Sequence, residues 1–400
     1  MTPDATRDRP RGRELSSAAA GLDAVDGLVV QAPETAARAR APRVWFVDIL
    51  RLIASFQMIN GHTLDAVMVT AIRHGEFYER YLWFRGLVSV TFLAVAGIAF
   101  HLSTLCRFEK HKGDPAAVRR RFRRAGIIIL VGYLLAFPWG AFNPDASLRE
   151  AAWYYFRSVG VLHCIGASLI ALELVTLLAR RASQVVWASA VLALGCFAVA
   201  PFMDARIADD ASHWGLNWVS HQGGSPFPLF PWAGFVFAGL VAGSFAMPQG
   251  GRTPFARSTG RFALVTLGAA ALWGLALLVP WRLFDVEVHH PATAPAHSLE
   301  KLVAVLSLVV LLAIACRPLR NLPAFFRALS SETLVIYAFH LVVLFYPGIA
   351  IARRFDHSLS LPRAAGVSAF MLVLTCGFTW FWHRAKARLA ARAARVSPGR

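Results

Sequence analysis

Long apolar runs separated by short polar segments make up most of the chain from residue 43 onward. A hydrocarbon core about 30 Å thick requires roughly 20 apolar residues for each spanning helix. By this measure the sequence predicts about ten membrane spans, near residues 44–66, 86–106, 125–142, 158–179, 184–203, 228–247, 262–284, 300–316, 331–351 and 364–382. The predicted fold is all-α, a polytopic membrane helical bundle.

The two ends of the chain depart from this pattern. Residues 1–42 are rich in Ala, Arg, Asp and Pro and contain no apolar run long enough for a signal-peptide core, so we expect a disordered cytoplasmic arm. Residues 43–382 form the predicted membrane domain, whose first span would act as an uncleaved anchor. Residues 383–400 form a predicted basic cytoplasmic tail.

Composition and charge agree with a membrane protein. Of 400 residues 56% are hydrophobic and 16% charged, with a mean hydropathy of +0.51, whereas soluble domains are about 25% charged. The formal charge of +18 would indicate nucleic-acid binding in a soluble chain. Here most basic residues lie in segments that are cytoplasmic if the N-terminus is, as the positive-inside rule requires. We therefore expect a lipid bilayer as surroundings, no nucleic-acid partner, and both termini in the cytoplasm.

Cysteines and loop residues give little sign of a metal or disulfide framework. The five cysteines lie in or beside apolar runs without a CxxC pair, and the histidines of the predicted outer loops 204–227 and 285–299 lack metal-ligand spacing. We expect no metal. The basic run Arg119–Arg124 has two interpretations: it is a topology signal beside anionic lipid, or it binds a phosphorylated ligand.

One face of the first predicted span is polar from end to end. At 100° per residue, Asp48, Arg51, Ser55, His62 and Asp65 fall within about 100° of arc. Ionisable groups at membrane depth cost about 2.5–3.5 kcal/mol each, so this polar stripe should face the bundle. A rise of 1.5 Å per residue puts Arg51 about 12 Å and His62 about 28 Å from the cytoplasmic edge, which places His62 near the outer surface.

His62 and Asp65 have the ingredients of a general base. A neutral imidazole can take a proton from a hydroxyl or amine, and a carboxylate three residues on can orient it or balance its charge. The alternative is structural, with Asp48 and Arg51 as an i,i+3 ion pair and His62 hydrogen-bonded to a neighbouring helix. The residues alone leave both interpretations open.

Several segments resemble known membrane acyltransferases. Ten residues separate Arg51 from His62, which resembles the R-x10-H pattern of the acyltransferase-3 family, and FVDILRLIASFQMINGHTLDAVM resembles the start of the heparan-alpha-glucosaminide N-acetyltransferase catalytic family in bacteria. The likeness continues through FLAVAGIAFHLS, SVGVLHCIGASL, FPLFPWAGFVFAGLVAG and LSSETLVIYAFHLVVLFY, over roughly residues 43–382. GVLH and FPLFPW favour the second family.

The resemblance implies transfer of an acyl group, often acetyl from acetyl-CoA on the cytoplasmic side, to a sugar hydroxyl or amine presented across the membrane. His62 matches the essential histidine, and Arg51 would steady its helix through Asp48 or meet the donor's polar arm. Acyl-CoA is then a co-substrate, and no tightly bound cofactor is implied. Vertebrate lysosomal members carry a large luminal domain before the first span, where this chain has a short arm. We therefore expect a cell-envelope glycan as acceptor, not heparan sulfate, and a multi-pass protein of the bacterial inner membrane.

Three later residues are further candidates for the site. His163 and His340 can line it with His62, or each can bond a backbone carbonyl within the bundle. Trp232 follows two prolines at the start of the sixth predicted span, where an interfacial anchor and a substrate-stacking ring are the two interpretations.

Two other function classes compete with acyl transfer. Many spans and an intramembrane polar stripe also mark transporters and flippases, although the sixth span repeats neither DxxR nor GHxxD of the first. A scaffold without chemistry is the weakest alternative, because five polar groups on one buried helix face are costly. The acceptor, the acyl length, O- versus N-transfer and a homodimer are left open by the sequence.

Overall fold

The computed structural model describes residues 44–396, except 143, 207–213, 223, 280–292, 320–321 and 347–348. The predicted N-terminal arm, residues 1–42, lies outside the described residues. Residues 40–384 form one compact unit, the helical bundle. Of a second unit, residues 1–39 with 385–400, the structure describes 385–396, the last turns of one long helix.

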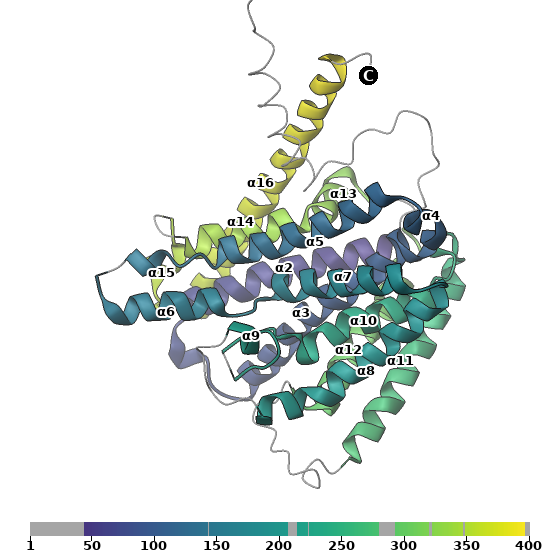
Figure 1. The fold of residues 1–400 in the computed structure, drawn as a ribbon. Coiled ribbons are helices and arrows are strands. Elements are labelled where there is room, and N and C mark those ends of the chain that lie inside the picture. Colours follow the sequence, from purple (N-terminus) through teal and green to yellow (C-terminus); the bar gives the residue numbers. More distant parts are fainter. Residues whose placement is uncertain are drawn as a thin grey trace, which may run out of the picture. The chain divides into compact units, whose positions relative to one another are not determined.

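The described part of the chain is helical and contains no β-strand (Figure 1). The longer helices are α2 (Trp45–Val67), α3 (Glu76–Ser103), α5 (Pro115–Leu135), α7 (Val161–Leu178), α8 (Ala182–Arg206), α10 (Leu229–Ala246), α11 (Phe255–Leu277), α12 (Pro295–Ala315), α14 (Thr333–Phe345) and α16 (Leu361–Val396). Shorter helices connect them, namely α4 (Phe108–Lys112), α6 (Ala146–Arg157), α9 (Trp214–Asn217), α13 (Ala324–Ser331) and α15 (Ile351–Phe355). The predicted all-α class is confirmed.

Seven described helices or helix runs are long and apolar enough to cross a membrane, and the count is eight if α13 and α14, bent by 76°, form one broken span. They correspond to eight of the ten predicted spans. The other two predicted spans coincide with α2 and α5, which are helical but less apolar. Three charged residues interrupt α2, and the first half of α5 contains the whole basic run Arg119–Arg124. The count of ten therefore stays a prediction.

The tightest contact in the bundle joins α3 to α10 through glycines. A Cβ atom on Gly97 would lie 1.9 Å from the carbonyl oxygen of Val236, and one on Gly239 would lie 2.0 Å from that of Ala94. Only hydrogen fits at these two positions, so the backbones of the two helices touch. In a membrane, where lipid is as apolar as leucine, such close packing is the main force that associates helices. Around this contact lies the largest buried apolar cluster.

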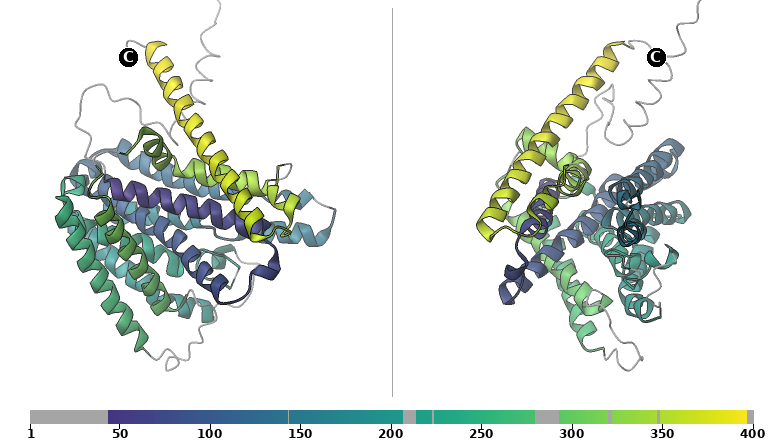
Figure 2. Two further views of the ribbon diagram at one scale, coloured as in Figure 1. Left: turned by 180° about the vertical axis from the view of Figure 1, so that it is seen from behind. Right: turned by 90° about the vertical axis from the view of Figure 1, so that its left-hand side faces the viewer.

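Helix α2 runs through the interior of the bundle, between α3 and α12 on one side and α13 and α14 on the other (Figures 1 and 2). Phe46, Val47 and Leu50 pack into the large cluster around α3 and α10. Leu52 and Ile59 pack into a second cluster with α13, α14 and α16. Because protein surrounds most of α2, its charged residues need not meet lipid, as the polar stripe predicted.

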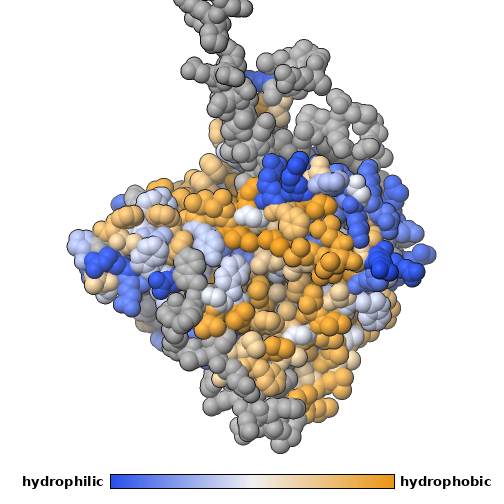
Figure 3. All heavy atoms as spheres, in the orientation of Figure 1, coloured by the Kyte–Doolittle hydropathy of each residue, from blue (hydrophilic) through white to orange (hydrophobic). Residues whose placement is uncertain are grey.

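Charged residues gather at the end of the bundle where α4 and the start of α5 lie, and apolar residues cover much of the remaining face in view (Figure 3). Asp114 caps α5 by accepting hydrogen bonds from the amides of Ala116 and Ala117, which lower the pKa of its carboxyl group. Beside it, a buried pair at 2.6 Å between His111 and Glu173 joins α4 to α7. This charged end is the cytoplasmic one if the positive-inside prediction holds.

Candidate functional site

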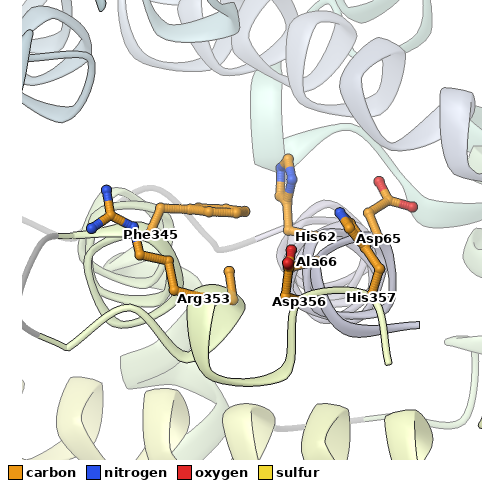
Figure 4. A pocket seen from close by; sticks show the side chains of 8 residues that line it. His62, Asp65, Ala66, Phe345, Arg353, Asp356 and His357 are labelled. Atoms are coloured by element: carbon orange, nitrogen blue, oxygen red, sulfur yellow. The ribbon is translucent and has the colours of Figure 1, made fainter. Parts of the chain in front are cut away.

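A pocket of about 280 Å³ opens beside the C-terminal end of α2 (Figure 4). One wall comes from α2, and the opposite wall comes from the chain between the end of α14 and the turn after α15. The residues that line it are His62, Asp65, Ala66, Phe345, Ala352, Arg353, Asp356 and His357. The pocket therefore contains the histidine and aspartate that the sequence singled out, and it lies far along α2 from Asp48.

His340 of α14 lies directly beside His62. The two imidazole rings are 5.5 Å apart between centroids and inclined by 32°. The Nδ1 atom of His340 is 2.8 Å from the carbonyl oxygen of Ile336. A carbonyl can only accept, so Nδ1 carries the proton and Nε2 presents a lone pair. That Nε2 is buried and has no hydrogen-bond partner within the described part of the chain. The ring of His62 therefore lies beside a second imidazole, and the Nε2 atom of that imidazole lacks a hydrogen-bond partner.

Asp65 is paired with an arginine from the next helix. Its Oδ2 atom lies 2.5 Å from Nη1 of Arg85 on α3. The stem of Arg85 passes over Gly61, where an added Cβ would stand 3.2 Å from the arginine Cδ. Arg85 is also close enough to interact electrostatically with His62. Asp65 was predicted to orient His62, and Arg85 was not among the predicted site residues. The available signal for Arg85 was its position as a lone arginine at the edge of an apolar run, in YLWFRGLV.

Arg73 ties the same end of α2 to the opposite wall of the pocket. Its Nη2 donates to the backbone oxygens of Asp65 and Met68, which are among the last carbonyls of α2 left without a helical partner. The same nitrogen lies 2.7 Å from Nδ1 of His357. Because arginine has no acceptor, His357 accepts this hydrogen bond and carries its own proton on Nε2. Arg73 was not among the predicted site residues.

Asp48 and Arg51 lie near the N-terminal end of α2, away from the pocket. They form an ion pair at 3.7 Å, the arrangement that the structural alternative predicts for residues three apart. The hydroxyl of Ser55 donates to the carbonyl of Arg51 at 2.8 Å. The polar stripe therefore has two parts, an internally paired half and the half that borders the pocket.

His163 and Trp232 lie in other surroundings. The amide of Gly160 donates to Nδ1 of His163 at 3.0 Å, and the imidazole packs at 4.2 Å from the ring of Tyr133 on α5. The indole of Trp232 is buried and donates to Nε2 of His221 at 3.1 Å. Neither residue lines the pocket that contains His62. His163 is held by the hydrogen bond at the start of α7 and by packing on Tyr133, and Trp232 is held by its hydrogen bond to His221.

Metal ligands are not gathered anywhere in the described ranges, where no three or more His, Cys, Asp or Glu residues are placed to hold an ion. The five cysteines are all free. The polar groups that line the pocket are imidazole, carboxylate and guanidinium groups.

A comparison of the sequence with protein families identifies the family of the chain. A model described as "Heparan-alpha-glucosaminide N-acetyltransferase, catalytic" matches residues 43–275, more than half of the chain. The chain belongs to this family. A search of curated proteins finds no match. The resemblance to the acyltransferase-3 family stays a prediction.

The heparan-alpha-glucosaminide N-acetyltransferase family identifies the chain as a membrane acyltransferase. The matched region runs from the start of α2 almost to the end of α11, so it contains His62, Asp65 and Arg85. It ends before His340 and before the whole wall between Phe345 and His357. The pocket is therefore made of one wall inside the matched region and one wall beyond it.

Proposed function

We propose that this protein transfers an acyl group, most simply acetyl, from acyl-CoA to a sugar hydroxyl or amine of a cell-envelope glycan, with His62 as general base. The observation that carries the proposal is the placement of His62 in an open pocket, with its ring beside the buried imidazole of His340. The family supplies the reaction type. No finding favours the transporter alternative.

In the proposed reaction the acceptor oxygen or nitrogen attacks the thioester carbonyl of acyl-CoA. A lone pair on the His62 imidazole takes the acceptor's proton as the new C–O or C–N bond forms. The C–S bond then breaks, and the coenzyme A sulfur leaves and recovers that proton from the imidazolium. Atoms and charge balance without a redox partner or metal. His340 is buried and does not line the pocket, so its Nε2 lone pair can accept a hydrogen bond from His62 and so fix the orientation of the base.

The two parts of the polar stripe lie toward opposite ends of α2. We infer that acyl-CoA enters from the end that carries Arg51 and the basic run of α5, while the glycan enters through the pocket. This arrangement suits a protein of the bacterial cytoplasmic membrane, with coenzyme A inside and the envelope outside. Asp48, through its ion pair with Arg51, then keeps that guanidinium in place.

The test is transfer by the purified full-length protein in lipid nanodiscs. Acetyl-CoA and an amino sugar are supplied, coenzyme A release is followed by thiol titration, and the acetylated sugar is identified by mass. Replacing the base, His62→Ala, should lower kcat by at least about 100-fold, since general base catalysis contributes roughly 10²–10⁴. His340→Ala should lower it by less, because a positioning group can be partly replaced by water.

The matched control is His297→Ala, which removes a partly exposed histidine on α12 that pairs with Glu300. It should retain wild-type kcat. Thermal unfolding and gel filtration of each variant separate loss of chemistry from loss of fold. Full transfer by a folded His62→Ala protein would exclude His62 as the base.

A further inference from the structure

The pocket wall opposite His62 is formed by Phe345, Ala352, Arg353, Asp356 and His357, which lie beyond the region matched by the family. Its members come from the end of α14, from the five-residue helix α15 and from the turn that follows. The family resemblance to the matched region therefore says nothing about what this wall recognises. The ligand that this wall can bind depends on the side chains that it presents to the pocket.

This wall is attached to α2 at several points. The amide of Val69 donates to the carbonyl of Leu359 at 2.9 Å, and the amide of Leu359 donates to the carbonyl of Val67 at 3.0 Å. His357 accepts from Arg73, as described above. Asp356 and His357 both have positive φ angles, 31° and 56°, a backbone region that residues other than glycine rarely occupy. Such geometry persists where surrounding contacts enforce it, and it is common at binding sites.

This wall presents one guanidinium, that of Arg353, and one carboxylate, that of Asp356, and the guanidinium together with the ring of Phe345 fits an acidic sugar. The ring of Phe345 is 47% exposed and extends toward His62, so one of its faces is available to a sugar ring (Figure 4). The guanidinium of Arg353 lies on the other side of Phe345 from His62 (Figure 4). Within the described part of the chain no carboxylate forms an ion pair with Arg353. A guanidinium binds carboxylates and phosphates through two parallel hydrogen bonds.

We propose that the acceptor is a sugar that carries a carboxylate or a phosphate, held by Arg353 at one end while its reacting hydroxyl or amine meets His62. Phe345 lies between these two groups and supports the ring. This inference rests on the proposed function for the reaction itself. It adds the charge of the acceptor and two specificity-determining residues, Phe345 and Arg353.

The experiment compares three acceptors with the full-length protein in nanodiscs. These are glucosamine, glucosamine 6-phosphate and glucosaminuronic acid. The two acidic sugars distinguish recognition of a phosphate from recognition of a carboxylate. The wild-type protein should show a lower KM for at least one acidic sugar than for glucosamine. The variant Arg353→Gln should raise that KM by about tenfold relative to the KM for glucosamine.

The control variant is Arg354→Gln, which removes the neighbouring exposed arginine that does not line the pocket. It should leave all three KM values at wild-type levels. A second variant, Phe345→Ala, should raise KM for acidic and neutral sugars alike, because ring support does not depend on charge.

Equilibrium binding of glucosamine 6-phosphate and of the uronic acid, measured by calorimetry without acyl-CoA, separates this inference from the proposed function. Weaker binding of the acidic sugars to Arg353→Gln supports it whether or not acyl transfer occurs. Equal binding of both acidic sugars to wild type, Arg353→Gln and Arg354→Gln would overturn it. If glucosamine is acetylated but Arg353→Gln binds the acidic sugars as the wild type does, the proposed function is supported and the inference about Arg353 is contradicted.

Discussion

Arg85 and Arg73 hold the C-terminal end of α2 from two directions. Arg85 pairs with the carboxylate of Asp65, and Arg73 donates to the backbone carbonyls of Asp65 and Met68. The Asp65–Arg85 pair is partly exposed, with 25% and 33% of the two side chains accessible, so its contribution to stability is modest. Its larger effect is to fix the position of α2 against α3 where His62 meets the pocket.

Breaking the pair with Arg85→Gln should lower kcat by roughly tenfold, because a displacement of about 1 Å at a reacting group is costly. The exchange Arg85→Asp with Asp65→Arg should recover part of that loss by restoring opposite charges. Steady-state transfer assays on the single and double variants measure both effects. As a control, Arg80→Gln removes a fully surface-exposed pair with Glu76 on the same helix and should change nothing. Unchanged kcat in a folded Arg85→Gln protein would contradict this role.

The residues of α2 could be predicted because a helical wheel needs only local geometry. The wheel placed Asp48, Arg51, His62 and Asp65 on one face, and the Asp48–Arg51 ion pair follows from their spacing. The partner of Asp65 could not be predicted, because it depends on how α3 is rotated and shifted against α2. That register is set by side-chain packing, such as the fit of Arg85 over Gly61, and the hydrophobic periodicity of the sequence contains no information about such packing.

At the level of helices, α3 and α10 form a closely packed pair at the centre of the bundle. Their approach depends on Gly97 and Gly239, each of which faces a backbone carbonyl of the other helix. Since α3 also carries Arg85, the position of the pocket depends indirectly on this contact.

Gly97→Ala should destabilise the protein by about 1–3 kcal/mol or more, because the added methyl group overlaps the carbonyl oxygen of Val236 and forces α3 and α10 apart. Thermal unfolding in nanodiscs measures the loss. Gly268→Ala is the matched control, since a Cβ at that position of α11 meets nothing within 4 Å. A normal unfolding temperature for Gly97→Ala would show that the backbones are not in contact.

The longer apolar helices were predictable from run length alone, and the shorter ones were not. The predicted span near 331–351 coincides with α14 but did not include α13, which precedes α14 at an angle of 76°. α15 falls at the end of the same predicted span and begins and ends beside residues with positive φ angles, Ala350 and Asp356. Nothing in the hydropathy pattern marks such a turn, so the second wall of the pocket could not be anticipated.

At the scale of the whole molecule, the charged end of the bundle and the pocket lie at opposite ends of α2. This separation matches a reaction in which donor and acceptor come from opposite sides of a membrane. It holds for the proposed orientation, with both termini in the cytoplasm.

Reporter fusions test that orientation. Fluorescent protein joined after Gly113 or after the C-terminus should fluoresce in a bacterial host, because this reporter matures only inside the cell, while alkaline phosphatase should be inactive there. Phosphatase joined after Gly75, in the connection between α2 and α3, should be active, because that point is then outside. Active phosphatase after Gly113 would reverse the assignment of donor and acceptor ends.

The two backbone hydrogen bonds between Leu359 and the end of α2 use no side-chain atoms. Side chains add to this attachment, because Phe355 packs against the end of α2 and His357 accepts a hydrogen bond from Arg73. The side chain of Arg353 makes none of these contacts, so a change at this position leaves the register between the two walls in place. Under the proposed function, such a change would alter which acceptor binds without altering the reaction.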